Sequence, residues 1–583
     1  MNGEAEAEAP AEPQQQSSAF AARLLGLWSA GTLSGILVQS LAHLAVLDGA
    51  SHEEIGLLAS CGAWGSQPGN IARDIHKHFL SDLRVAEPTL VNMTCLDSKT
   101  SSEVTAEAAV FLPHQMFAAL REYSSLSGLF DPSKLQAFWA QVVAKQDPKL
   151  HNHPMVLQDD WQKTFIPVFV HGDGVEFQTR DSLLVYSWGF LLAQGASSDT
   201  SYLMACFPKS ATTKQDKGRG TWDPILNQLR DSFCAAFRGT WPSGPQEGEA
   251  LVAGGFKLVL WSLLGDHDYF SNTLGLNHWA AHSMCWCCDA SSQDHGKHWK
   301  KHQPEARGWR TKTPQQCLDS QPTHQFFEIP GASTLMVAHD LLHVLWCKGV
   351  LSHLLGSSLH VWLWPDKNRR QRPTTPAQDL AKLFLRIQEL YKQFDAGTRL
   401  TNLRIAMFVD EKAHWQGHPF LSIKGAECKH LLPCMTQVAG ELAGGEEFGE
   451  RLEACMQAIN AFSTLIDTSD TFLSDEQGEL AEELVLSFLD HYEWLTKWAE
   501  SKDRQDFHQV PKFHMLLHVA ETAKFMNPKM QWCFKSEDFV GKIATLGHSV
   551  SMGVASKNIS QKICQKYRHW LHFRLTRGDS FEE

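Results

Sequence analysis

The order of the apolar segments between residues 160 and 270 constrains the fold more than any other feature of this sequence. Strand-like apolar runs occupy residues 166–170, 177–192, 201–207 and 255–264. Between the third and fourth runs, Asp223 can cap a helix that carries apolar residues at helical spacing on one face. The order strand–strand–strand–helix–strand therefore predicts an α/β (α+β) unit built around a mixed sheet.

Acidic residues follow two of these runs. Asp173 lies in His171-Gly-Asp-Gly174 after the first run, and Asp266 comes shortly after the fourth. The order of segments is similar to that of an RNase H-like core, in which neighbouring strands would bring the two carboxylates to one sheet edge. A single Asp-Gly pair usually forms a turn, so the interpretation depends on both acids and on Glu537 in a late helix-forming segment.

Three carboxylates in such a cluster suit phosphodiester chemistry. Two hard divalent cations about 4 Å apart can activate an oxygen nucleophile and stabilise a leaving oxygen, and such cations prefer carboxylate ligands. We therefore expect Asp173, Asp266 and Glu537 to be catalytic and to bind Mg²⁺ or Mn²⁺.

The rest of the chain is organised around this core. We expect a disordered leader (1–18), a helical N-terminal region (19–150), the first part of the core (160–270), a large, mostly helical insertion with a zinc-binding Cys pair (271–510), and a C-terminal part with the Glu537 helix and a basic tail (511–583). The leader is rich in Glu, Pro and Gln, which is typical of disorder. The apolar stretch Leu24–Leu47 is interrupted by Ser, Thr, Gly, Gln39 and His43, so we expect a buried or amphipathic helix rather than a membrane span.

The formal charge is −13, from 52 Lys and Arg against 65 Asp and Glu, which argues against a protein that coats nucleic acid non-specifically. The tail differs, because residues 539–578 contain seven Lys and Arg and no acid. A second basic group lies in the insertion, where Lys residues are interleaved with His and Trp that could stack on a base. Either group could also be an ordinary solvated surface. The candidate DNA contacts are Lys297, Lys300, Lys301, Lys542, Lys562, Lys566 and Arg568.

Fourteen Cys occur without a preceding signal peptide, so we expect a reducing compartment rather than a disulfide framework. Cys285 and Cys288 have the spacing that lets two thiolates bind one Zn²⁺. His514 and His518 would share one face of a helix and could supply two further ligands. Other interpretations of the cluster are a local pair of His295 and His298, a ligand role for Cys287, and buried Cys without a metal.

Seven motifs in order give the chain a resemblance to the CACTA-type (Plavaka-like) DDE transposases and their fungal and protist relatives. The motifs span roughly Ile166 to Lys542. Each motif alone is loose, whereas seven in the family's order are specific. They are Val170-His-Gly-Asp-Gly174, Gly265-Asp-His-Asp268, Cys285–Cys288, Asp340-Leu-Leu-His343, Lys424-Gly-Ala-Glu-Cys-Lys-His-Leu-Leu-Pro433, Phe513-His-Met-Leu-Leu-His518 and Glu537-Asp-Phe-Val-Gly-Lys542.

The resemblance implies an RNase H-like fold with Asp173, Asp266 and Glu537 as the metal-binding triad. It also implies Mg²⁺-dependent nicking at transposon ends followed by strand transfer. Asp268 and Asp538 lie so close to two members of the triad that either could be the true ligand instead.

The resemblance also bears on two smaller groups. It favours a structural Zn²⁺ bound by the Cys pair together with His514 and His518, which would clamp the insertion to the core and fix the Glu537 helix. It suggests that Asp340 and His343, one helical turn apart, support the active site or hold flanking DNA. A buried hydrogen-bonded pair or a helix start is the alternative for these two residues.

The expected function is therefore a nuclear enzyme that acts on double-stranded DNA, both transposon ends and target, as a homo-oligomer and without a membrane. The alternative is a catalytically inactive, host-captured derivative that binds DNA or chromatin. A weaker third possibility is a metal-dependent phosphodiesterase acting on RNA or structured nucleic acid, because RNase H-like cores support many reactions.

Overall fold

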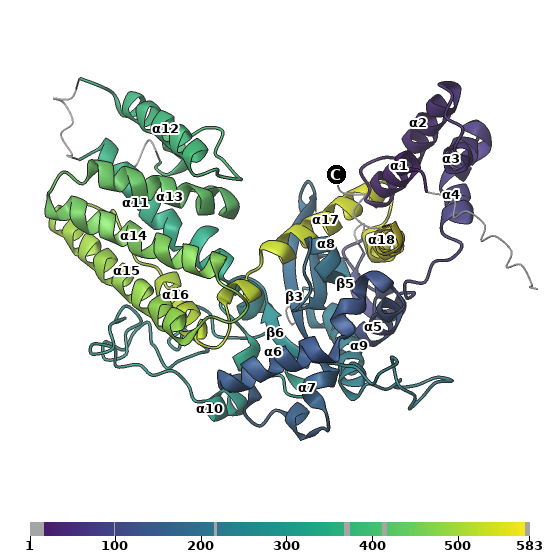
Figure 1. Ribbon diagram of the computed structural model, residues 1–583, viewed down its shortest axis with the longest axis horizontal. Helices are drawn as coiled ribbons and strands as arrows, with labels where there is room; N and C mark the ends of the chain where they lie inside the picture. The colour runs from purple at the N-terminus through teal and green to yellow at the C-terminus, as the bar shows by residue number, and fades with distance from the viewer. Residues whose placement is uncertain (1–16, 98–99, 215–217, 366–372, 411–416, 578–583) are drawn as a thin grey trace, which may run out of the picture.

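The computed structural model describes residues 17–97, 100–214, 218–365, 373–410 and 417–577. The fold is mixed α/β, with a single six-stranded sheet in these residues and helices on either side of it (Figure 1). The leader expected at 1–18 lies outside the described residues except for its last two.

The sheet has the strand order β1-β2-β5-β4-β3-β6. β3 and β6 are parallel, whereas the other neighbouring pairs are antiparallel. Helix α9 (Arg219–Arg238) lies between β5 and β6 along the chain, so the predicted order of three strands, a helix and a fourth strand is confirmed. The strands are β1 (Thr89–Leu96), β2 (Glu103–Val110), β3 (Phe165–Gln178), β4 (Asp181–Phe190), β5 (Ser201–Pro208) and β6 (Lys257–Leu264).

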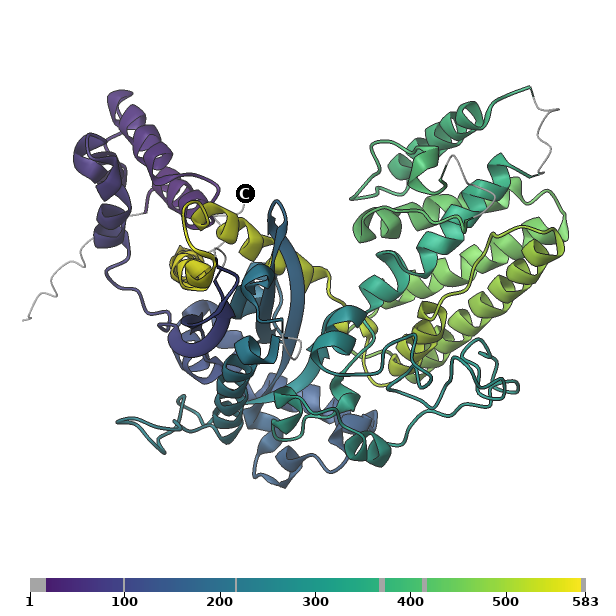
Figure 2. The ribbon, with the colours of Figure 1, turned by 180° about the vertical axis from the view of Figure 1, so that it is seen from behind.

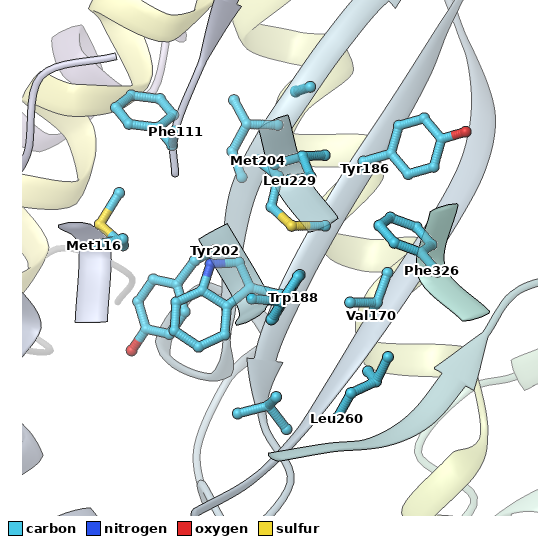
Figure 3. Packing of buried hydrophobic residues seen from close by; sticks show 14 of the residues in the cluster. Phe111, Met116, Val170, Tyr186, Trp188, Tyr202, Met204, Leu229, Leu260 and Phe326 are labelled. Atoms are coloured by element: carbon cyan, nitrogen blue, oxygen red, sulfur yellow. The ribbon is translucent and has the colours of Figure 1, made fainter. Parts of the chain in front are cut away.

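Helices cover both faces of the central strands, which explains why their sequences are continuously apolar instead of alternating. Tyr186 and Trp188 of β4 point toward α9, where the Tyr186 ring lies 5.1 Å from that of Trp222 (Figure 3). The opposite face packs against α17 (Phe534–Val550) and α18 (Ser556–Arg577). There the backbone N–H of Leu203 donates a hydrogen bond to the Tyr567 hydroxyl at 3.1 Å.

The helix α18 closes this second face. It packs on β2 and β5, and the backbone N–H of Ala109 donates to the Ser560 hydroxyl at 3.3 Å across 451 residues of sequence. The same helix contacts α1, where the Lys566 ammonium lies 4.0 Å from the centre of the Trp28 ring. The C-terminal helix thus joins the N-terminal helices to the sheet.

Two strand boundaries differ from the sequence prediction. β3 continues to Gln178, so Asp173 lies within the strand and pairs with Val185 of β4 instead of following the strand. The apolar run ends earlier because one side of the strand becomes exposed after His171, while the backbone pairing continues. Helix α9 begins at Arg219, so Asp223 lies inside its first turns and is not the cap.

The prediction that the region 19–150 is helical is wrong in part. Strands β1 and β2 lie within this region and extend the sheet beyond β5. β2 contains three Ala and two Glu, which favour helices. Pairing along all eight residues of β1 overrides this local preference.

The first four helices form a separate cluster at one end of the molecule, seen from both sides in Figures 1 and 2. The stretch Leu24–Leu47 is broken between α1 and α2, and none of the described helices is long and apolar enough to cross a membrane. The N-terminal helices are α1 (Ala19–Ser29), α2 (Gly35–Leu47), α3 (Glu53–Trp64) and α4 (Ile71–Phe79). Those around the sheet are α5 (Pro113–Arg121), α6 (Pro132–Ala144), α7 (Trp161–Thr164) and α8 (Ser197–Thr200).

The insertion after β6 forms a helical body on the other side of the sheet (Figure 1). Its first part differs from the prediction, because residues 274–313 form turns and isolated bridges and contain no helix. The Cys motif lies in this irregular segment. The helices that follow are α10 (Pro314–Asp319), α11 (Val350–Leu363), α12 (Pro376–Gln393), α13 (Gly425–Leu442), α14 (Glu447–Thr468), α15 (Asp475–Ser501) and α16 (Lys512–Thr522).

Candidate functional site

Two groups of chemically active side chains lie where the insertion meets the sheet. The first consists of Cys285 and Cys288 from the irregular segment and His514 and His518 from α16. All four residues are buried, and their ligand atoms all lie within 4.8 Å of one another. The predicted association of the Cys pair with this His pair is therefore present in the structure.

The spacing of these atoms fits a tetrahedral Zn²⁺. Nε2 of His514 lies 3.2 Å from Nε2 of His518 and 3.3 Å from Sγ of Cys288. With Zn–N near 2.0 Å and Zn–S near 2.3 Å, two tetrahedral ligands are separated by about 3.3 Å (N to N) or about 3.5 Å (S to N). The four residues could thus hold a metal such as zinc.

The surroundings of the cluster also suit a metal. Nδ1 of His518 lies 2.8 Å from the Glu521 carboxylate, which in turn pairs with Arg307 at 3.2 Å. A carboxylate on the outer nitrogen of a metal-ligating His fixes the ring and its tautomer. Trp309 is buried and packs its ring against His514 and His518, which excludes water.

The pKa values of His518 and Cys285 indicate the protonation states of the cluster when no metal is bound. Burial alone would lower the pKa of His518, but the charge of Cys285 and the hydrogen bonds to Cys285 and Glu521 raise it to about 10. Burial would raise the pKa of the Cys285 thiol, yet hydrogen bonds from Cys287 and Cys288 and the charge of His518 lower it well below its usual range. The metal-free cluster therefore contains a thiolate and an imidazolium, and a bound Zn²⁺ would displace the imidazolium proton.

The alternative zinc ligands for the Cys pair, His295 and His298, do not lie in a ligand group with it. His295 is exposed, and the His298 ring stacks on Trp299 with ring centres 5.6 Å apart. Neither residue belongs to a metal-ligand group in the described part of the chain.

The second group contains the three predicted acids. β3 and β6 run parallel, and His171 pairs with Leu264, so Asp173 and Asp266 each lie two residues beyond a paired position on neighbouring strands. Glu537 lies in the first turn of α17, which packs on β3. Segments separated by up to 364 residues thus converge at one end of the sheet.

Two of the three acids have raised pKa values. The pKa of Asp173 is raised to about 7, first by burial and then by the negative charges of Glu537 and Asp266. The pKa of Glu537 is raised as well, mainly by burial; the charge of His343 opposes this rise, and the charges of Asp340 and Asp266 add to it. A carboxylate cluster with raised pKa values is a candidate cation-binding site, because a cation would relieve the repulsion.

Asp340 and His343 link the carboxylates to the body of the insertion. The buried Asp340 accepts hydrogen bonds from the backbone N–H groups of Leu342 and Cys533, and from Nδ1 of His343 at 2.5 Å. Nε2 of His343 lies 3.2 Å from the Glu537 carboxylate. His343 therefore bridges Asp340 and Glu537, and its backbone lies in a π-helical turn rather than in the regular helix that the sequence suggests.

The charge of this bridge follows from its neighbours. Burial would lower the pKa of His343, but the hydrogen bond to Asp340 and the charges of Asp340, Glu537 and Asp266 raise it to about 9. At neutral pH, His343 is therefore an imidazolium that holds the Glu537 carboxylate in place.

The two neighbouring acids point to other partners. Asp268 is exposed and accepts a hydrogen bond from the Asn272 side chain at 2.6 Å. Asp538 pairs with the Lys542 ammonium at 3.3 Å and accepts a hydrogen bond from the Ser197 hydroxyl. Asp266 and Glu537 are therefore the better placed member of each pair.

The candidate DNA contacts divide into paired and exposed side chains. Lys297 pairs with Asp289 at 2.5 Å, Lys300 lies over the Trp299 ring, and Lys301 is exposed. In the tail, Lys562 is exposed, whereas Lys542, Lys566 and Arg568 have internal partners: Asp538, Trp28 and Glu87, respectively. The paired residues would have to exchange these partners to contact a phosphate.

The three acids are spaced differently from the Cys and His ligands. Among the described residues, the groups with ligand atoms all within 4.8 Å are Cys/His groups, and the acids do not form such a group. Octahedral Mg²⁺ with oxygens at 2.0–2.1 Å needs its ligands within about 4.2 Å of one another. The three acids therefore do not lie at the spacing that a single Mg²⁺ requires.

Sequence reasoning missed the residues that support the zinc ligands. The Glu521 carboxylate lies one helical turn after His518, a spacing that could have been recognised. Arg307 and Trp309 come from the irregular segment and carry no spacing signal.

No protein-family model matches the chain, and no curated protein matches it.

Proposed function

We propose that the chain is a DDE transposase-like polynucleotidyl transferase of the CACTA type, which cleaves DNA and transfers strands using two divalent metal ions. The observation that carries this proposal is the convergence of Asp173, Asp266 and Glu537 at one end of the sheet. Three acids from distant segments, two of them with raised pKa values, are difficult to explain as ordinary surface charge.

The sheet supports the proposal at the level of the fold. The strands β5-β4-β3-β6, with β3 and β6 parallel and α9 inserted between β5 and β6, have an arrangement similar to that of an RNase H-like core. The β1–β2 hairpin extends this arrangement beyond β5. In the proposed assignment, Asp173 comes from the first strand of the core, Asp266 follows the fourth, and Glu537 comes from the helix that packs behind them.

The side chains suggest how the site would work. Mg²⁺ or Mn²⁺ bound by the three carboxylates would supply Lewis-acid chemistry for phosphodiester cleavage. His343 would keep Glu537 oriented, and the Cys/His cluster would fix α16, which precedes the Glu537 helix in the chain. The proposed partners are double-stranded DNA, at transposon ends and target, and further copies of the chain, and the proposed location is the nucleus.

The test is cleavage of a pooled library of labelled DNA duplexes in the presence of Mg²⁺ or Mn²⁺. Asp173→Asn, Asp266→Asn and Glu537→Gln should each abolish metal-dependent nicking while leaving the fold intact. Asp268→Asn is the matched control, because it removes the same charge only two residues from Asp266 but from an exposed side chain. Nicking that survives all three substitutions would rule out the site.

The second candidate is a captured derivative that binds DNA or chromatin without catalysis. It is favoured by the spacing of the acids, whose oxygens are not gathered to the distances that a single ion requires. Duplex binding by the unmodified protein, with no nicking under any divalent cation, would select this alternative.

A further inference from the structure

A second group of metal-ligating atoms adjoins the zinc ligands. Cys285, Cys287 and His339 place one sulfur or nitrogen atom each within 4.8 Å of the others. Sγ of Cys287 lies 3.6 Å from Nε2 of His339, close to the roughly 3.5 Å expected for a sulfur and a nitrogen on one tetrahedral ion. Cys285 belongs both to this group and to the group completed by Cys288 and the two His of α16.

The shared residue lies between the two groups. A thiolate sulfur has several lone pairs, so it can bind one ion on each side. Backbone amides support the loop: the N–H of Cys287 donates to Sγ of Cys285 at 3.3 Å, and the N–H of Ala290 donates to Sγ of Cys288 at 3.4 Å. Donation of this kind stabilises thiolates and orients them toward a metal.

The two groups differ in their access to solvent. The four residues of the first group are all buried, whereas Cys287 is only partly buried. Cys287 and His339 line a cavity of about 280 Å³ that is also bordered by Cys317, Glu521 and Trp286; of the first group, only His518 lines it. Three protein ligands beside a cavity form the arrangement in which zinc keeps an open coordination position, unlike a closed four-ligand structural site.

We propose that this region binds two zinc ions bridged by the Cys285 thiolate. The first ion is closed by Cys288, His514 and His518. The second ion is bound by Cys285, Cys287 and His339, and its fourth ligand is a water molecule from the cavity. Thiolate and imidazole ligands select zinc over Mg²⁺, so this site takes a different metal from the carboxylate cluster.

The test is the zinc content of the full-length chain, purified from zinc-replete cells and dialysed against metal-free buffer. The unmodified protein should contain two zinc ions per chain, and Cys287→Ser and His339→Ala should each contain one. Cys317→Ser is the matched control, because this Cys lines the same cavity but belongs to neither ligand group, and it should retain two. Circular dichroism establishes that each variant is folded.

A second measurement uses the difference in access. A coloured chelator should remove zinc from the unmodified protein in two phases of equal amplitude, and Cys287→Ser should lack the fast phase. One zinc ion per unmodified chain, unchanged in Cys287→Ser, would overturn the proposal. A single ion lost equally in Cys287→Ser and Cys288→Ser would overturn it too, because one mononuclear site would then explain all ligands. Zinc content does not depend on DNA cleavage, so this result and that of the nicking assay are separable.

Discussion

Asp173→Asn should stabilise the metal-free carboxylate site, and the effect should depend on pH. The Asp173 pKa of about 7 in the folded protein lies about three units above the ordinary value of 3.8. At 1.36 kcal/mol per unit, this shift corresponds to about 4 kcal/mol at most. Because the side chain is partly exposed and solvent screens its neighbours, we expect about 1–2 kcal/mol.

The sign follows from proton binding. Between about pH 4 and pH 7 the folded protein retains a proton on Asp173 that the unfolded chain has released, so stability falls as pH rises through this interval. The deficit then persists above pH 7. Asn carries no charge, and its side-chain oxygen can still accept the hydrogen bond that Asp173 takes from the Gly174 N–H at 2.6 Å. The variant should therefore be more stable than the unmodified protein at pH 8 and equal to it near pH 4.

The assay is thermal unfolding followed by tryptophan fluorescence at several pH values, in buffer from which Mg²⁺ and Mn²⁺ have been removed by dialysis so that tightly bound zinc is retained. Added Mg²⁺ should stabilise the unmodified protein more than the variant, because it neutralises the repelling carboxylates. Asp268→Asn should melt like the unmodified protein throughout. An equal gain for Asp173→Asn at pH 5 and pH 8, or no gain at pH 8, would refute the electrostatic reasoning.

Three further predictions concern the residues around the two sites. Glu521→Gln removes the carboxylate behind His518 and should weaken zinc binding by about 10–100-fold in a chelator competition, while Glu482→Gln, another partly buried acid, should not. His343→Gln removes the positive charge beside Glu537, so the pH above which Mg²⁺ stabilises the protein should rise; an unchanged midpoint would contradict the bridge. Trp139→Ala should cost about 3–5 kcal/mol of unfolding free energy in urea, because the fully buried ring is lost and the Phe165 carbonyl loses its donor at 2.8 Å; a loss below 1 kcal/mol would show that the core collapses to fill the space.

The sequence predicts the central strands well because their composition and order agree. Residues 201–207 are buried on both faces, so a continuous apolar run is sufficient to identify β5. β2 could not be predicted in this way, since its Ala and Glu residues favour a helix and only pairing with β1 makes it a strand. The C-terminal end of β3 could not be predicted either, because its last residues pair through the backbone while their side chains are partly exposed.

The site shows the same division between local and long-range information. The spacings of Cys285 with Cys288 and of His514 with His518 are local, and both pairs could be recognised. Their meeting depends on the fold, so spacing alone left other partners open. His339 carries no signal at all, because it reaches Cys287 from an irregular segment 52 residues away.

The position of α18 has a consequence for how the chain reaches its native state during synthesis. Ala109 of β2 meets Ser560 of α18 only after a further 451 residues have been made. At 5–20 residues per second, this interval lasts about 20–90 seconds. Once β5 has been made, the apolar face formed by β2 and β5 lacks its cover for the rest of this interval, and the end of the sheet lacks Glu537 until α17 has been made. A ribosome-bound chain that already contains β1 to β6 is therefore a natural client for chaperones, and a product that ends before residue 556 should aggregate rather than fold into a smaller domain.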